Sequence, residues 1–506
     1  MYTYKNPVIP GYHPDPSVCR DGDDFYLVTS TFEFFPGVPI YHSKNLVNWE
    51  CIGHCLTRKE QVPLEGCPPS AGIFAPTLRY YNNIWYMTTT NVSGGGNFIV
   101  YTADIRGQWS DPVWIAQGGI DPSLLFFDNK VYFCSTGGEN ESKNGHWEHG
   151  IYLCEINPHT GTMVTRSALI SKGTGGRNPE APHIYHKDGW FYLMLAEGGT
   201  EYGHMVTIQR SRDIYGPYEP CPYNPILSHR DRGGHSIQAT GHADIFQDHN
   251  GYWWMVFLGI RPISHSMLHN LGRETFLAPV QWIDGWLVVG NNGMCELIME
   301  GPLPAKPENP DFNFTADFSE PFDLRWNYIR NPDTGRYILK DNLLTLVGDK
   351  QTLSTSRGSP VFIGIRQQAF NMNAETGLCP PDTGRAGISV FYNENYHYEI
   401  YAKRCQNGRL LIVVNRCIGD LEVQTYKAEI NTCEAIGLRI NSDREKYRFA
   451  YNVNGAWVEA GNGFVAGLCT EITHTMTFTG VYVGLFASGG KADFTRMEIT
   501  YNLEDM

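Results

Sequence analysis

Short runs in which hydrophobic and polar residues alternate fill this chain, and turn residues such as Gly, Asn and Asp bound each run. Runs of this kind predict β-strands, whereas long stretches with a helical period of 3.6 residues are scarce. Five runs share a further pattern, a polar turn followed by an aromatic strand. They lie at 24–28, 83–87, 130–133, 189–193 and 251–255. We therefore expect an all-β protein with an internal repeat.

The spacing of the five aromatic strands predicts a propeller. Their anchoring aromatic residues are 46 to 62 residues apart, which leaves room for about four strands in each repeat. Repeats of this length and content are typical of propeller blades, because radial repetition protects the edges of each sheet. Five repeats predict a five-bladed β-propeller over residues 1–300.

A change of pattern after residue 300 predicts a second domain. Residues 301–310 contain four prolines, which is typical of a stiff linker. Residues 311–506 return to plain strand alternation with intervening turns, and they predict a β-sandwich. The predicted fold class is thus all-β, a five-bladed β-propeller followed by a β-sandwich accessory domain.

Ionisable residues recur at one register of the repeat. About eleven residues before the aromatic anchor of four of the five repeats lie Asp15, Asp121, Glu180 and His242. The innermost strands of a propeller converge on its axis, so these groups are expected to line one funnel. Crowded carboxylates repel one another and are costly to desolvate, so they favour a chemical role over a stabilising one. Paired carboxylates fit acid/base hydrolysis of a glycosidic bond.

Composition narrows the range of partners. The 506 residues include 53 acidic and 39 basic ones, with a formal net charge of −14 and no Lys/Arg-rich block. We therefore expect no nucleic acid partner and a neutral substrate. Neither a signal-like apolar region nor a stretch of 18 apolar residues is found, which predicts no membrane association and a cytoplasmic location. Thirteen cysteines without CxxC pairs predict reduced thiols.

Several ordered motifs together resemble glycoside hydrolase family 43, and most closely its two-domain β-xylosidases and α-L-arabinofuranosidases. The similarity extends over the whole chain, including 320–326 and 480–485. The motifs in the first 300 residues are His13-Pro-Asp-Pro-Ser17, Ser30-Thr-Phe-Glu-Phe-Phe-Pro-Gly37, Ile120-Asp-Pro-Ser-Leu124, Pro179-Glu-Ala-Pro-His183, Ala196-Glu-Gly-Gly-Thr200, Thr240-Gly-His-Ala-Asp244 and Leu271-Gly-Arg-Glu-Thr275.

The resemblance implies a role for each carboxyl. Asp15 corresponds to the general base, Glu180 to the general acid, and Asp121 to a third carboxylate that orients the acid and raises its pKa. The family inverts the anomeric centre, and inversion requires the acid and the base to be roughly 6.5–9.5 Å apart so that a water fits between them. Taken singly, Asp-Pro steps are ordinary turn chemistry, so the assignment depends on their shared register.

The resemblance also implies residues around the sugar. Arg273 corresponds to an arginine that binds sugar hydroxyls and pairs with the acids, and Thr200 to a polar sugar contact. Phe32 and Phe74 correspond to apolar walls, although aromatic residues in β proteins usually belong to the core. Phe74 stands where many relatives have Trp, which would widen the wall. His242 corresponds to a histidine that holds a water or a calcium ion at the propeller axis. No cofactor is required for the chemistry.

These observations predict an exo-acting, inverting glycoside hydrolase. It would release xylose from the non-reducing end of short β-1,4-xylo-oligosaccharides, with α-L-arabinofuranosidase side activity. One alternative is mainly α-L-arabinofuranosidase activity on arabinoxylan or arabinan oligosaccharides, and a remote alternative is a non-catalytic carbohydrate-binding protein. The second domain carries no catalytic set of its own. It is expected either to cover the funnel mouth or to form a homo-oligomer.

Overall fold

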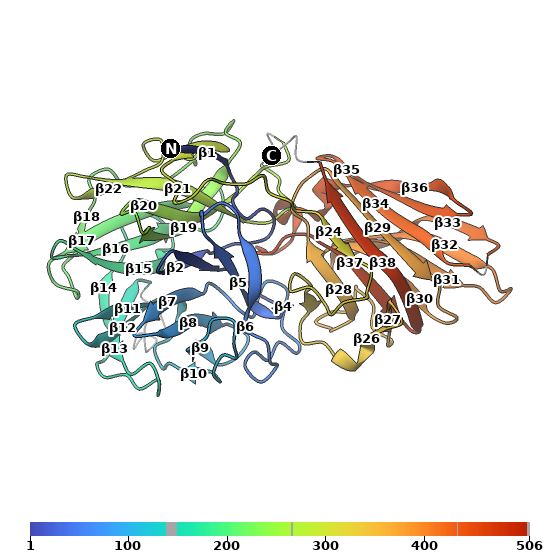
Figure 1. Cartoon of the computed structure of the whole chain (residues 1–506), viewed down its shortest axis with the longest axis horizontal. Helices are drawn as coiled ribbons and strands as arrows, with labels where there is room; N and C mark the ends of the chain where they lie inside the picture. Colours follow the sequence, from blue (N-terminus) through green and yellow to red (C-terminus); the bar gives the residue numbers. More distant parts are fainter. Residues whose placement is uncertain (138–148, 265–266, 433, 503–506) are drawn as a thin grey trace.

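The computed structural model describes residues 1–137, 149–264, 267–432 and 434–502 (Figure 1). Within these ranges the helices are three short 3-10 turns, η1 (Thr334–Arg336), η2 (Val465–Leu468) and η3 (Thr470–Ile472). None of the helices in these ranges has the length and apolar character that a membrane crossing needs. Nearly all other regular structure is β-strand, which confirms the all-β prediction.

The first part of the chain forms five four-stranded antiparallel sheets, as the repeat predicted. The predicted aromatic strands are the second strand of each sheet. The first two sheets consist of β2 (Ser17–Asp21), β3 (Asp24–Val28), β5 (Gly37–Ser43) and β6 (Glu50–Leu56), and of β7 (Thr77–Tyr81), β8 (Ile84–Asn91), β9 (Gly96–Thr102) and β10 (Val113–Trp114). The third and fourth consist of β11 (Ile120–Phe127), β12 (Lys130–Thr136), β13 (Ile151–Ile156) and β14 (Ala168–Ser171), and of β15 (Glu180–Lys187), β16 (Trp190–Glu197), β17 (Met205–Ser211) and β18 (Glu219–Pro220). The fifth consists of β19 (Gln238–Gln247), β20 (Trp253–Ile260), β21 (Glu274–Ile283) and β22 (Trp286–Val289).

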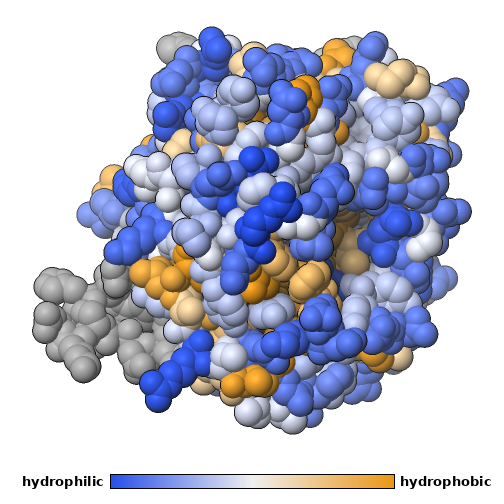
Figure 2. Space-filling model, turned by 90° about the vertical axis from the view of Figure 1, so that its left-hand side faces the viewer, coloured by the Kyte–Doolittle hydropathy of each residue, from blue (hydrophilic) through white to orange (hydrophobic). Residues whose placement is uncertain are grey.

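The five sheets are the blades of a propeller. Each innermost strand, β2, β7, β11, β15 and β19, contacts the next one, and β19 contacts β2, which closes the ring. Strand β1 (Tyr2–Lys5) pairs with β23 (Ile298–Gly301), so the two ends of this part of the chain are joined. Figure 2 shows the end of the molecule formed by the propeller, where hydrophilic residues dominate and hydrophobic ones appear in small groups.

A buried ion pair ties four of the blades together near the axis. Asp244 on β19 has no exposed surface and pairs with Arg79 on β7 at 2.8 Å. Its oxygens also accept hydrogen bonds from Ser17 Oγ at 2.7 Å and from Tyr185 Oη at 2.7 Å, which lie on β2 and β15. Arg79 and the other partners hold the pKa of Asp244 well below its usual range although burial raises it. The network is therefore structural, since all of its members are paired.

The second part of the chain is a β-sandwich of two antiparallel sheets. No strand lies between β23 and β24 in residues 302–313. One sheet consists of β26 (Tyr337–Lys340), β27 (Leu343–Val347), β38 (Lys491–Tyr501), β29 (Met372–Cys379), β34 (Ile436–Ser442), β35 (Lys446–Val453) and β36 (Ala456–Phe464), with β24 (Phe314–Ala316) on β38. The other consists of β28 (Val361–Arg366), β37 (Tyr482–Ser488), β30 (Arg385–Asn393), β31 (Tyr396–Arg404), β32 (Leu410–Ile418) and β33 (Leu421–Ile430).

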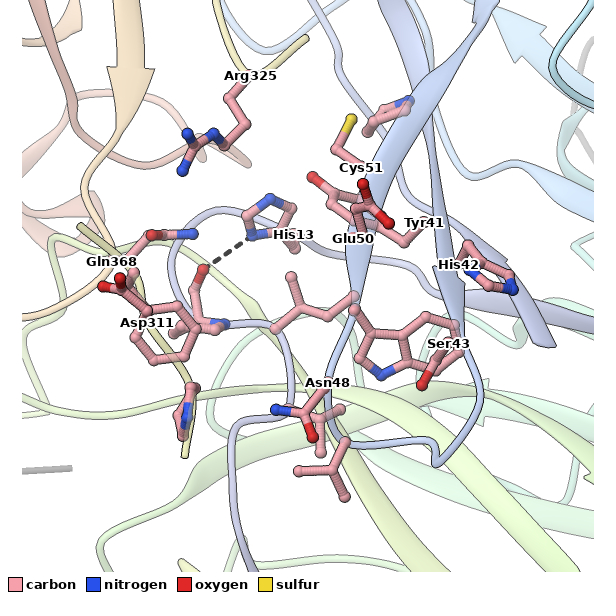
Figure 3. A pocket seen from close by; sticks show the side chains of 18 of the residues that line it. His13, Tyr41, His42, Ser43, Asn48, Glu50, Cys51, Asp311, Arg325 and Gln368 are labelled. Atoms are coloured by element: carbon pink, nitrogen blue, oxygen red, sulfur yellow. Dashed lines mark hydrogen bonds between the residues drawn. The ribbon is translucent and has the colours of Figure 1, made fainter. Parts of the chain in front are cut away.

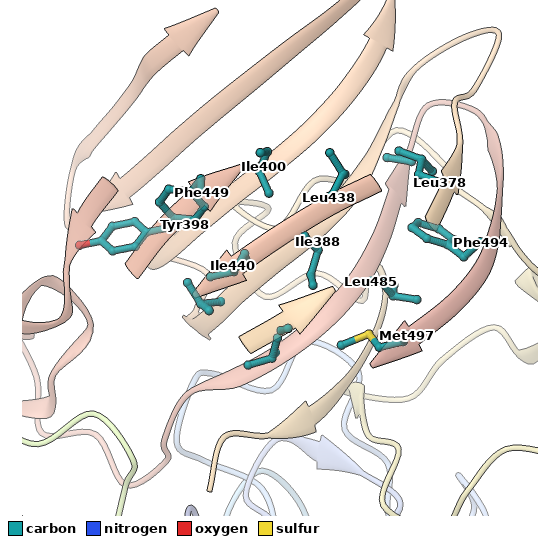
Figure 4. Packing of buried hydrophobic residues seen from close by; sticks show 14 of the residues in the cluster. Leu378, Ile388, Tyr398, Ile400, Leu438, Ile440, Phe449, Leu485, Phe494 and Met497 are labelled. Carbon is teal, nitrogen blue, oxygen red and sulfur yellow. The ribbon is translucent and has the colours of Figure 1, made fainter. Parts of the chain in front are cut away.

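Alternating residues of the two sheets meet in an apolar core between them. Ile388 and Leu485 from one sheet and Leu438 and Phe494 from the other are fully buried (Figure 4). Burying a side chain of this size stabilises the fold by about 1.5–3 kcal/mol. The sandwich therefore has a core of its own and confirms the predicted second architecture.

The propeller and the sandwich share a second apolar core at their junction. Strand β4 (Phe34–Phe35) of the propeller pairs with β25 (Tyr328–Ile329), which follows the linker. Phe34 stacks on Tyr482 of β37 with ring centroids 4.1 Å apart. The same cluster includes Phe32, one of the residues expected to line the active site. The junction is thus continuous with the wall of the predicted funnel.

Candidate active site

The predicted catalytic residues lie where the inner strands begin irregularly. Asp15, Asp121 and His242 have φ values of 56°, 54° and 45°, in the left-handed region that residues other than glycine seldom adopt. The pairing of β11 with β12 shifts between Ile120 and Ser123, and that of β15 with β16 shifts between Glu180 and His183. Such bulges re-aim a side chain at the end of a strand.

Asp15 is held as a buried carboxylate. It is 4 % exposed, and its Oδ1 accepts a hydrogen bond from Arg273 Nη1 at 3.0 Å. Its Oδ2 accepts a short hydrogen bond from Ser30 Oγ, and His242 Nδ1 lies 3.5 Å from Oδ1. Burial raises the pKa of Asp15, but Arg273, His242 and Ser30 outweigh burial and hold that pKa below its ordinary value. Asp15 is therefore ionised near neutral pH.

Arg273 connects both domains to the site. Its Nη1 also donates to Thr200 Oγ1 at 2.9 Å, while its Nη2 donates to the backbone oxygen of Phe478 at 3.2 Å. Phe478 belongs to the loop between η3 and β37 of the sandwich. Gly272 has a φ of +84°, and a Cβ at that position would lie 3.0 Å from the Cα of Gly480, so the two loops pack backbone to backbone. The sandwich therefore helps to place the arginine.

Asp121 and Glu180 both favour the protonated form. The pKa of Asp121 is raised well above its usual value by burial, then by the negative charges of Glu180 and Asp15. The pKa of Glu180 is raised to about 7 by burial and by Asp15, whereas Arg273 and Arg177 lower it. The repulsion acts on the three acids together, so a proton stays within the pair Asp121 and Glu180 near neutral pH. The 18 % exposure of the Glu180 side chain leaves it open to a reactant.

Three phenylalanines form one wall beside Arg273. The ring centroids of Phe32 and Phe74 are 5.1 Å apart, and the ring of Phe478 stacks on Phe32 at 5.5 Å. The guanidinium of Arg273 lies 5.7 Å from the centre of Phe32 and 5.5 Å from that of Phe478. Phe32 is 2 % exposed, and Phe74 is half-buried. An apolar wall next to a hydrogen-bonding cation suits a ligand with both hydroxyl groups and an apolar face.

His242 lies beside Asp15 as a buried, neutral imidazole. It is 6 % exposed, and burial lowers its pKa although Asp15 raises it, so the imidazole is neutral near pH 7. Calcium prefers six to eight oxygen ligands. In the described part of the chain no group of three or more His, Cys, Asp or Glu side chains could hold a metal ion. The calcium ion expected at His242 therefore stays a prediction.

The structure brings most of the predicted residues together and adds others. Asp15, Arg273, Thr200 and His242 form direct contacts or near approaches, and Phe32 and Phe74 share a wall with Arg273. Two further residues were missed, His204 and Phe478. The buried imidazole of His204 lies 4.0 Å from Glu180 Oε1. His204 lies four residues after the motif Ala196–Thr200, which is a weak sequence signal for a place near the site. Phe478 follows no such motif.

Family models match both parts of the chain. Residues 4–287 match the model for glycosyl hydrolases family 43. Residues 315–500 match the model for the beta xylosidase C-terminal concanavalin A-like domain. The first match spans the propeller with its candidate acids, and the second spans the sandwich. Both agree with the architecture described above.

Relatives that match nearly the whole chain are named as arabinofuranosidases, as xylosidases or as both. The chain is 41 % identical to the non-reducing end alpha-L-arabinofuranosidase BoGH43B of Bacteroides ovatus, over 96 % of this chain and 92 % of the relative. It is 36 % identical to a xylosidase/arabinosidase of Butyrivibrio fibrisolvens, over 99 % of both chains. The crystal structure of a xylan beta-1,4-xylosidase from Bacillus halodurans superposes with a TM-score of 0.91 at 31 % identity, covering 98 % of this chain and all of the other.

Proposed function

We propose that this chain releases xylose from the non-reducing end of short β-1,4-xylo-oligosaccharides with inversion of the anomeric centre. The chain belongs to glycosyl hydrolase family 43 and is therefore a glycosidase. α-L-Arabinofuranosidase activity accompanies this reaction. The observation that carries the proposal is the contrast between an ionised Asp15 and a protonated Glu180 in one buried cluster. Single-displacement hydrolysis needs these two protonation states at once.

Each candidate residue has one task in this mechanism. Asp15, kept ionised by Arg273, removes a proton from a water that attacks the anomeric carbon. Glu180 donates its proton to the leaving glycosidic oxygen as the bond breaks. The reaction ends with the proton of the water on Asp15 and with Glu180 ionised, and exchange with solvent restores both. Asp121, whose own pKa is raised by burial and by Glu180, shares the proton held within this pair and orients the acid.

The exo mode of action is supported by the wall of three phenylalanines. Phe478 of the sandwich contacts the two propeller rings at one side of the site. Such a closed side leaves room for a terminal sugar rather than for a continuing chain. Arg273 and Thr200 offer hydrogen bonds to its hydroxyls. The second domain then shapes the pocket, and a cytoplasmic location and a homo-oligomer stay as further predictions.

A second candidate function is α-L-arabinofuranosidase as the main activity. It is favoured by the printed name of the Bacteroides ovatus relative. Phe74 is half-buried and stands where the family resemblance has the larger Trp in many relatives. The smaller ring is compatible with a furanose.

One preparation of the enzyme decides between the two functions. It is assayed on 4-nitrophenyl β-D-xylopyranoside and on 4-nitrophenyl α-L-arabinofuranoside, and then on xylobiose and arabinobiose. The proposal expects the larger kcat/KM on the xylosides. A larger value on both arabinosides would replace it by the second function, and no release from any of the four would reject both.

A further inference from the structure

The proposed reaction fixes the place of the leaving sugar. Glu180 protonates the glycosidic oxygen, so that oxygen has to lie within hydrogen-bond reach of the Glu180 carboxyl, at roughly 3 Å. The side chain of Glu180 is 18 % exposed, so one side of it is open to solvent. Exposed residues close to Glu180 are therefore the ones that a leaving sugar can contact.

The cavity between the two domains is not that place. It has a volume of about 520 Å³ and lies where blade one, the linker and the sandwich meet, with His13, Glu50, Asp311 and Gln368 around it (Figure 3). None of the three candidate catalytic carboxyls lines it. A sugar in this cavity could not receive the proton of Glu180.

One exposed cation lies next to Glu180. Arg177 precedes Glu180 by three residues, and its positive charge lowers the pKa of Glu180. Its side chain is 60 % exposed. Arg273 also lowers this pKa, but it is 6 % exposed and hydrogen-bonded to Asp15. Of these two arginines, Arg177 is therefore the one that a molecule arriving from solvent meets at the acid.

Both arginines contact the same short segment of the chain. Arg177 Nη2 donates to the backbone oxygen of Gly198 at 3.2 Å, and a Cβ on Gly199 would lie 2.5 Å from that nitrogen. The next residue is Thr200, whose Oγ1 accepts a hydrogen bond from Arg273 Nη1 at 2.9 Å. Residues 198–200 thus hold one arginine inside the site and the other on its solvent-exposed side.

A buried carboxylate fixes the loop that carries Arg177. Glu197 has no exposed surface and accepts hydrogen bonds from the backbone N–H groups of Thr174 at 2.8 Å and of Gly176 at 2.6 Å. The backbone N–H of Gly198 donates to the backbone oxygen of Arg177 at 2.6 Å. These bonds join the loop before β15 to the end of β16. The main chain at Arg177 is therefore held in place while its side chain stays exposed.

The guanidinium of Arg177 has donors to spare. It pairs with the carboxylate of Glu201, whose side chain is 50 % exposed. Exposed ion pairs contribute little to stability, so a hydroxyl group can share this one at small cost. A guanidinium carries five N–H donors, and the two carboxylate oxygens accept further hydrogen bonds. Together Arg177 and Glu201 can bind neighbouring hydroxyls of one sugar.

We propose that Arg177, with Glu201 beside it, binds the hydroxyls of the leaving sugar and makes the enzyme prefer a sugar to other leaving groups. This assignment rests on the proposed function, because the role of Glu180 as the acid places the leaving group. It adds a specificity-determining residue outside the part of the site that holds the terminal sugar.

Three substrates with the same terminal sugar separate this role from an indirect effect on the acid. The leaving group of xylobiose needs a proton and carries hydroxyls. That of cyclohexyl β-D-xylopyranoside needs the proton but has no further hydroxyl, and that of 4-nitrophenyl β-D-xylopyranoside needs neither. The kcat/KM values are measured at about pH 5.5, where Glu180, with a pKa of about 7, is mainly protonated. If arabinosides are the better substrates, the three matching arabinosides take their place.

Arg177→Met should lose about three- to tenfold in kcat/KM on xylobiose, as expected for a lost hydrogen bond. The loss on the other two substrates should be markedly smaller. Arg106→Met is the control, because Arg106 is exposed in the loop after β9, and it should match the wild type on all three.

Two results would overturn the assignment of Arg177. An unchanged kcat/KM on xylobiose would show that Arg177 does not contact the leaving sugar. Equal losses on xylobiose and on the cyclohexyl xyloside would show that Arg177 acts through Glu180 instead. Wild-type enzyme that is inactive on every one of these glycosides would reject the proposed function itself, and the assignment with it.

Discussion

Two clusters of buried ionisable groups lie on the inner strands of the same propeller, and they are balanced in opposite ways. Asp244 has Arg79 as its ion-pair partner and accepts further hydrogen bonds from neighbouring blades. The second cluster sets Asp15, Asp121 and Glu180 close to Arg273, and the pKa values of two of its acids are raised above their ordinary values. The carboxylate of the first cluster is fully paired, whereas the carboxyls of the second outnumber the cations close to them.

The difference separates structural from chemical use of the same residue type. A buried carboxylate that is fully paired contributes to the fold and has little proton affinity left. Carboxylates that outnumber their cations keep a proton near neutral pH at a cost in stability, and such perturbed groups mark functional sites.

The largest expected effect is on turnover when the ionised acid is neutralised. Asp15→Asn removes the proposed base, and kcat/KM for xylobiose should fall by about 10³-fold or more, as expected for loss of general base catalysis. Because Arg273 then loses a buried ion-pair partner, the unfolding midpoint in urea should fall as well. Both quantities are measured on the same preparation.

Asp244→Asn is the matched control in the satisfied cluster. Removing one partner of a buried ion pair typically costs about 3–5 kcal/mol of the free energy of unfolding. The folded fraction should keep most of its kcat. A loss of turnover in Asp244→Asn without a loss of stability would break the comparison.

The next effect depends on the leaving group. Glu180→Ala should lose about 10²- to 10⁴-fold on xylobiose, because the leaving alkoxide needs a proton. On 4-nitrophenyl β-D-xylopyranoside the loss should be much smaller, since nitrophenolate leaves readily without one. Steady-state kinetics on both substrates provide the test, and equal losses would argue against Glu180 as the acid.

A smaller effect is expected from the second domain. Phe478→Ala removes the sandwich's part of the apolar wall, and KM for xylobiose should rise by about tenfold, as for a lost side-chain burial of 1–3 kcal/mol. Phe464→Ala is the control, because Phe464 is 60 % exposed on the same domain. A Phe478→Ala enzyme with the wild-type KM would remove the sandwich from the pocket.

The smallest effect is a gain in stability. The pKa of Glu180 is raised to about 7 from 4.5, so the folded state binds its proton more tightly than the unfolded state does. Wild-type stability therefore falls as pH rises from about 4.5 to about 7, then levels off. Glu180→Gln cannot ionise and should be more stable than the wild type at pH 8, by no more than about 3 kcal/mol.

Urea unfolding of wild type and Glu180→Gln at pH 4 and pH 8 measures this gain. At pH 4 the two free energies of unfolding should nearly coincide, because Glu180 is then protonated in both states. A variant that is less stable than the wild type at pH 8 would show that the ionised side chain is satisfied after all.

The repeat made the propeller predictable, because a period read from five aromatic strands depends on local sequence alone. The same period placed Asp15, Asp121 and Glu180 at equivalent strand starts. It could not show that Asp15 and Asp121 have left-handed φ values, or that the pairing shifts at the starts of β11 and β15, since Asp-Pro and Ala-Pro steps occur in ordinary turns as well.

Contacts between the domains lay outside the reach of the sequence. Phe478 is separated from Phe32 by more than 400 residues, and nothing in its neighbours differs from other turns of the sandwich. The calcium ion expected at His242 stays a prediction, because the described residues show no cluster of three or more His, Cys, Asp or Glu side chains.

The anomeric form of the first product tests the central claim most directly. Proton NMR of wild-type enzyme with xylobiose, recorded before mutarotation proceeds, should show α-xylose as the initial product from the non-reducing end. Glu180→Gln under the same conditions should release almost none. Initial β-xylose, or an unchanged rate in the variant, would contradict a single displacement driven by Asp15 and Glu180.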